Sequence, residues 1–200
     1  MTVPTSVAPT YAPPTRSTAE LSMIAGLSED AQKLLGGDEP VSPRDFLGQL
    51  MDKELHIDAV KFLAHALPRR EAVWWAWVCA RKASGPEPAT PIQHALDAAE
   101  RWIVQPTDEH RRQALAFGEA AEFGTAAGCA CLAAFMSGGS LGPADTPPVP
   151  PGEFMTAKAV FGSVTLAAVA TEPDAAPQKF GEFMKLGVEV AERTRLWPTS

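Results

Sequence analysis

Proline positions place the strongest constraint on what this chain can fold into. Proline has no backbone N–H and clashes with the preceding turn, so it is tolerated at the start of an α-helix but not in its interior. The 19 prolines lie mainly between segments of ten to twenty residues in which apolar side chains recur every three or four positions. That spacing is typical of amphipathic helices, whereas the alternation expected of strands is sparse. The sequence therefore predicts an all-α fold.

The expected architecture is a compact orthogonal bundle or a stack of helix pairs, with about seven to eight helices. Two helices should begin at a Ser or Thr cap followed by proline, at Ser42-Pro43 and at Thr90-Pro91. The predicted helices cover approximately residues 43–51, 57–67, 69–83, 91–105, 108–123, 125–136, 157–169 and 174–197.

Composition divides the 200 residues into one domain with appendages. Residues 1–17 form a Pro/Thr-rich tail that we expect to be disordered. Residues 18–41 have a weak helical pattern and are interpreted as a linker. Residues 42–200 form a single helical domain, with a Gly/Pro-rich loop over residues 137–155.

Charge and hydropathy exclude several classes of protein. The net charge is −7 and no stretch is densely basic, which argues against a nucleic-acid partner. The longest apolar stretch, residues 123–136, is shorter than the ~20 residues that a membrane span requires, so no membrane insertion is expected. Three cysteines without disulfide spacing fit a reducing compartment, and we expect a cytoplasmic protein.

No catalytic or metal-binding motif is present. On a helix, Cys129 and Cys131 would diverge by about 200°, so they are interpreted as core residues rather than as metal ligands. The four histidines are scattered and are interpreted as ordinary surface or boundary residues: His56, His65, His94 and His110. We expect no cofactor, no metal and no enzymatic activity, although an enzyme with dispersed residues remains a third hypothesis.

The segment Leu67-Pro-Arg-Arg-Glu-Ala-Val-Trp-Trp-Ala-Trp77 is the most unusual stretch. Arg69 and Arg70 fall in the first turn of a helix, where the helix dipole disfavours cations and the backbone N–H groups attract anions. The favoured interpretation is an internal carboxylate partner, either Glu71 or an acid from another helix. The alternative is a site for a phosphate or for a partner's carboxylate.

Helical geometry divides the aromatic part of the same segment into two faces. Val73, Trp74, Trp77 and Val78 cluster on one side, which we expect to face the core. Trp75 points away from them, so the helix is either central or exposes Trp75 as an anchor for a partner. The central position is favoured.

Four prolines dominate the later part of the Gly/Pro-rich loop: Pro147, Pro148, Pro150 and Pro151. Such a cluster favours the polyproline II conformation, which aromatic grooves of partner domains recognise. A rigid crossover lying against its own domain is favoured over an external ligand motif.

Four motifs together resemble a family of uncharacterised bacterial helical proteins over about residues 43–197. They are LPRREAVWWAW at 67–77, ALDAAERW at 95–102, FMSGGSL at 135–141 and PPVPP at 147–151. The family is a domain of unknown function, some of whose members are encoded among type VI secretion genes. The resemblance implies a cytoplasmic adaptor or accessory protein with a protein partner, and it transfers no catalytic residue. The alternative function is a regulatory domain that binds a small anion or small molecule at Arg69 and Arg70.

Overall fold

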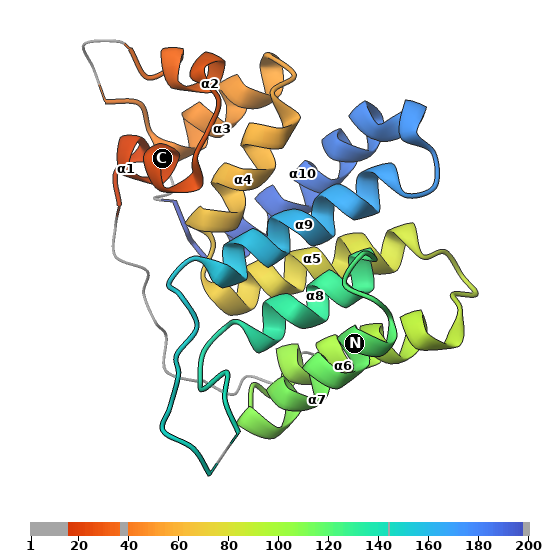
Figure 1. The fold of residues 1–200 in the computed structure, drawn as a ribbon. Coiled ribbons are helices and arrows are strands. Elements are labelled where there is room, and N and C mark those ends of the chain that lie inside the picture. Colours follow the sequence, from red (N-terminus) through yellow and green to blue (C-terminus); the bar gives the residue numbers. More distant parts are fainter. Residues whose placement is uncertain (1–15, 37–39, 144, 198–200) are drawn as a thin grey trace.

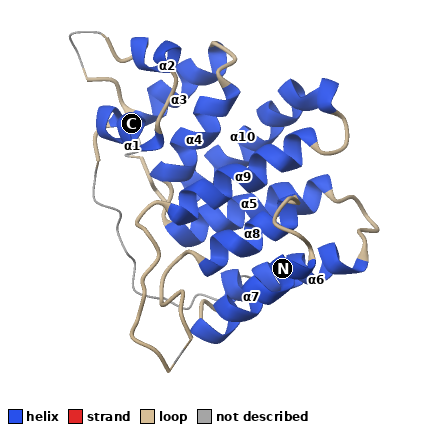
Figure 2. Ribbon diagram, viewed as in Figure 1, coloured by secondary structure: helices blue, strands red, loops and turns tan. Residues whose placement is uncertain are grey.

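The computed structural model describes residues 16–36, 40–143 and 145–197. Within these residues there are ten α-helices, one short 3-10 helix and no strand, so the all-α prediction is confirmed (Figure 2). The predicted tail lies outside the described residues up to position 15. The α-helices are α1 (Thr18–Ala25), α2 (Glu29–Lys33), α3 (Pro43–Asp52), α4 (His56–Ala66), α5 (Arg69–Ala83), α6 (Thr90–Val104), α7 (Asp108–Ala120), α8 (Ala126–Phe135), α9 (Met155–Val169) and α10 (Ala176–Arg193).

Local capping explains where several helices begin. The Ser42 hydroxyl accepts a hydrogen bond from the backbone N–H of Asp45, with Pro43 in the first turn, as predicted. Thr90 is not a cap: α6 begins at Thr90 itself, after Ala89, and no side chain caps this helix. The start moves by one residue because a first-turn proline already fixes the backbone angle and removes one orphan N–H group.

The long helices lie in a stack (Figure 1). Helices α5, α8 and α9 pack on one another at its centre, and α6 and α7 pack beside α8. Helix α4 packs on the other side of α9, and α10 contacts α4, α5 and α9. The core therefore runs continuously through the molecule, with α5 surrounded by neighbours.

Residues 18–35 are part of this core, which corrects their interpretation as a linker. Leu21, Leu27 and Ala31 are buried within the single apolar cluster. Asp58 of α4 is also buried and accepts hydrogen bonds from the backbone N–H and hydroxyl of Ser28, at 2.8 and 2.7 Å. The apolar pattern of these short helices is weak because a few side chains and one carboxylate are enough to hold them against α4.

Helix α8 accounts for the long uncharged stretch of the sequence. It is buried among α5, α6, α7 and α9, so no charged face is needed. Gly118 of α7 permits close packing here, because a Cβ atom at this position would lie 2.8 Å from the Cβ of Cys131. Among the helices of the described residues, none has the length and apolarity needed to cross a membrane.

Candidate functional site

The proline-rich loop between α8 and α9 projects away from the helices (Figure 1, teal; Figure 2, tan). Its prolines Pro147, Pro148 and Pro150 are exposed, and Pro151 is half-buried. Val149 is 54% exposed and Leu141 is 37% exposed. The expectation that this segment lies against its own domain is therefore wrong for residues 147–150. The few contacts that hold the loop are made at its base.

Arg111 of α7 anchors that base. Its side chain is 4% exposed, and its guanidinium donates to the carbonyl oxygens of Phe135 and Ser140 at 2.8 and 2.9 Å. The group also lies over the Phe135 ring, 4.6 Å from its centroid. Gly139 has a φ of +66°, and a Cβ atom there would lie 2.9 Å from the Arg111 guanidinium. The glycine is thus required for both the turn and the close approach of Arg111.

Asp108 links Arg111 to a second arginine. Its carboxylate accepts from Arg112 at 2.8 Å and from Arg111 at 2.6 Å. These hydrogen bonds, with that of Arg112 the stronger influence, hold the pKa of Asp108 below its ordinary value. Arg112 in turn donates to the carbonyl of Gly142 at 3.0 Å. Two cations and one carboxylate therefore fix the first half of the loop.

The two halves of the loop are tied to each other. The Leu141 N–H donates to the Val149 carbonyl at 2.8 Å, and the Val149 N–H donates to the Ser140 hydroxyl at 3.0 Å. Sequence reasoning missed this anchoring set. The Asp-x-x-Arg-Arg spacing at residues 108–112 is the signal that could have indicated it, because it places both arginines within reach of one carboxylate.

The two arginines at the start of α5 do not form one site. Arg69 donates to the carbonyls of Ser137 and Glu153 at 2.9 and 3.3 Å, whereas Arg70 donates to the Ile103 carbonyl at 2.6 Å. The expected carboxylate partner is therefore replaced by main-chain oxygens. Glu71 forms no ion pair in the described part of the chain.

Trp75 is fully buried, so it is not an exposed anchor and α5 is central, as favoured. Its indole N–H donates to the carbonyl of Phe183 in α10 at 2.8 Å. Gly187 allows this contact, because a Cβ atom there would lie 2.8 to 2.9 Å from the indole. Trp74 and Trp77, which were expected to face the core, pack against it but are only half-buried, since α10 covers the side that Trp75 occupies.

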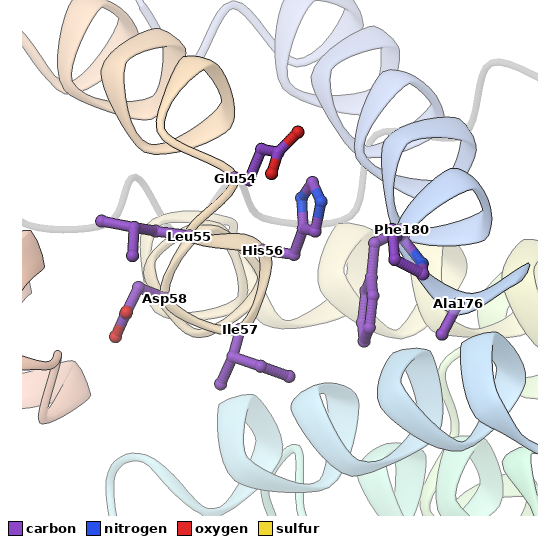
Figure 3. Close-up of a pocket in the computed structure, with 8 residues that line it drawn as sticks. Glu54, Leu55, His56, Ile57, Asp58, Ala176 and Phe180 are labelled. Atoms are coloured by element: carbon purple, nitrogen blue, oxygen red, sulfur yellow. The ribbon is translucent and has the colours of Figure 1, made fainter. Parts of the chain in front are cut away.

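Two hollows lie elsewhere on the molecule. The larger, of about 290 Å³, is mainly apolar and lies between the starts of α4 and α10. Figure 3 shows His56 and Phe180 facing each other across it, with Glu54 at the rim and Asp58 on the other side of α4. The smaller, of about 60 Å³, lies where α4, α5 and α9 meet.

The described residues contain no group of three or more His, Cys, Asp or Glu side chains placed to hold a metal ion. The three cysteines are buried, as expected. Cys129 and Cys131 donate to different carbonyls, those of Phe123 and Ala95. Burial raises the pKa of all three thiols, that of Cys131 to about 12, which suppresses thiolate chemistry.

One of the comparisons with known proteins assigns a family to this chain. A model described as "Family of unknown function (DUF6931)" matches residues 46–191. The chain belongs to this family. The expected resemblance to a domain of unknown function is thereby confirmed for DUF6931, whose matched range includes α4 to α9 and the proline-rich loop. No curated protein and no solved structure matches the chain.

Proposed function

We propose that this DUF6931 protein is a non-enzymatic adaptor that presents its proline-rich loop to an aromatic-lined groove of a partner protein. The observation that carries the proposal is the exposure of Pro147, Pro148 and Pro150 on a loop whose base is held by Arg111. A segment fixed at its base and exposed at its tip is suited to recognition by another molecule.

The conformation of residues 146–151 supports this type of recognition. Proline fixes its own φ near −65° and moves the preceding residue toward extended backbone, so Thr-Pro-Pro-Val-Pro-Pro favours polyproline II. A preformed helix of this kind loses little conformational entropy on binding, and its prolines fit between aromatic rings. Val149, 54% exposed, adds an apolar side chain to the same surface.

The resemblance described above extends the proposal to the cellular setting. It implies a cytoplasmic accessory protein, and we infer that the partner belongs to a type VI secretion assembly. Burial raises the pKa of the Cys79 and Cys131 thiols, which argues against either thiol as a nucleophile.

The test is a quantitative pull-down from the native cell, compared among three forms of the full chain. The loop variant carries Pro147→Ala, Pro148→Ala and Pro150→Ala. The matched control carries Pro86→Ala and Pro88→Ala, in the connection between α5 and α6. We expect one partner to be retained in stoichiometric amount by the wild type and the control, and to be lost by the loop variant.

A synthetic peptide of residues 140–152 should compete for the same partner. Thermal unfolding of the three forms separates lost binding from lost folding, because the substituted prolines are exposed or half-exposed. Equal capture by the loop variant and the control, or capture that the peptide does not reduce, would contradict the proposal.

A further inference from the structure

A small cavity at the junction of α4, α5 and α9 has the chemistry of a binding site. It measures about 60 Å³, well above the space that one water molecule needs. Its lining combines apolar residues with four ionisable side chains: Arg16, His65, Arg69 and Glu153. Arg16, the α4–α5 junction and Glu153 lie in three separate parts of the chain, which the fold brings together.

His65 contributes an atom that the protein itself leaves without a partner. Its Nδ1 lies 2.8 Å from the Lys61 carbonyl, which can only accept, so Nδ1 bears the hydrogen and Nε2 holds a lone pair. That Nε2 atom is buried and has no hydrogen-bond partner among the described residues. A buried ring nitrogen in this state is costly unless something else binds it.

Several cationic side chains lie near His65. Burial lowers the pKa of His65, and the neighbouring cations Lys158 of α9, Lys61 of α4 and Arg16 lower it further. Arg69 of α5 lines the same cavity, and the only carboxylate among its described lining residues is Glu153, which pairs with Arg16. In a chain of net charge −7, this is a locally cationic site.

The N-terminal ends of two helices also favour negative charge at this cavity. Both α5 and α9 begin at this cavity, after Pro68 and Phe154, and neither helix has a side-chain cap. The N-terminal ends of both dipoles therefore favour an anion here. Phe154 also lines the cavity, and the Arg16 guanidinium lies over its ring, 5.1 Å from the centroid.

We propose that this cavity binds a small oxyanion, held by Arg16 and Arg69, together with a proton taken up by Nε2 of His65. The lone pair of Nε2 receives the proton from solvent, and the new N–H donates to the anion. The negative ligand offsets the burial and the repulsion by neighbouring cations that lower the pKa of His65. Because Arg70 faces α6 instead, the site is different from an Arg69–Arg70 pair. The inference is independent of the role of the proline-rich loop.

Sulfate is a suitable probe, because its own charge does not change between pH 6 and pH 8. We expect saturable calorimetric binding to the full chain, measured against sodium chloride of equal ionic strength. The affinity should be higher at pH 6 than at pH 8, by about tenfold or more, as for one charge-assisted hydrogen bond. Titrations in two buffers of different ionisation enthalpy should show net proton uptake.

Two substitutions and one control test the roles of His65 and Arg16 in sulfate binding. His65→Gln should abolish the pH dependence and the proton uptake, and Arg16→Gln should weaken binding by about tenfold. His56→Gln is the matched control: His56 is also half-buried with an unpaired ring nitrogen, but no arginine lines its hollow. The His56→Gln variant should bind sulfate with the affinity and pH dependence of the wild type.

Thermal unfolding shows whether each variant remains folded. Arg16 lies on the N-terminal segment, so Arg16→Gln tests the site and leaves the core intact. Absence of saturable sulfate binding by the wild type would overturn the proposal. The proposal would also be overturned if sulfate binding by His65→Gln kept its pH dependence. It would be overturned as well if His56→Gln lost as much sulfate affinity or pH dependence as His65→Gln.

Discussion

Several cationic side chains of this protein satisfy the carbonyl ends of helices. Arg70 donates to Ile103 in the last turn of α6, and Arg111 donates to Phe135 at the end of α8. Lys61 donates to Gly26, the residue that ends α1. The last four carbonyls of a helix have no partner within it and carry the negative end of its dipole, so these contacts are favourable.

Gly139 should be far more sensitive to substitution than its neighbour. Gly139→Ala combines a left-handed backbone, which costs about 1–2 kcal/mol for a residue with a Cβ atom, with a contact that displaces Arg111. Gly138→Ala meets nothing within 4 Å and should change the free energy of unfolding by less than about 0.5 kcal/mol. Urea denaturation measures the free energy of unfolding of both variants. Equal losses in the two variants would show that the position of Arg111 does not depend on this turn.

The tryptophans of α5 should differ in their contributions to stability. Trp75→Ala removes a fully buried indole and its hydrogen bond to Phe183, and should lower the free energy of unfolding by about 3–5 kcal/mol. Trp74 is half-buried and lies against Arg193, so Trp74→Ala should cost clearly less. Chemical denaturation of the two variants gives the comparison, and a larger loss for Trp74 would contradict the packing described.

At the scale of helices, small residues determine how closely neighbours approach. Gly118 brings α7 against α8, and Gly187 brings α10 against the Trp75 indole. Alanine and glycine also fill α8, which has neighbours on all sides. Helical periodicity predicted these helices but not which pairs would touch, because small residues are compatible with several packing partners.

The close contact of α7 and α8 can be tested with a pair of glycine substitutions. Gly118→Ala would place a Cβ atom 2.8 Å from that of Cys131, and should destabilise the protein by about 1–3 kcal/mol through overpacking. Gly181→Ala, in α10, meets nothing within 4 Å and should stabilise it by roughly 0.5–1 kcal/mol. Melting temperatures that shift in the same direction would contradict this account.

At the scale of the whole molecule, the packed unit begins before the region matched by the family model. The match starts at residue 46, whereas Leu21, Leu27 and Ala31 already belong to the core. Helix α1 packs on α4, and Ser28 caps α2 while donating to Asp58. The two short helices therefore cover a face of the domain that would otherwise be open.

Truncation measures what these helices contribute. A chain that begins at residue 42 loses two buried leucines, each worth about 1.5–3 kcal/mol, and its free energy of unfolding should fall by roughly 3 kcal/mol or more. A chain that begins at residue 15 is the reference. Equal melting temperatures for the two forms would restore the interpretation of residues 18–41 as a linker.

The sequence by itself determined the helical segments from α3 to α10, because their signals are local. Serine and proline at the start of α3, proline in the first turn of α6 and a repeat of three to four residues act within a few positions. Only the tertiary structure decided the environments of the candidate residues. The Trp75 indole donates a hydrogen bond to a carbonyl 108 positions away, and Arg69 donates one to a carbonyl 68 positions away. Partners at such distances depend on how the helices pack, which no local pattern in this chain encodes.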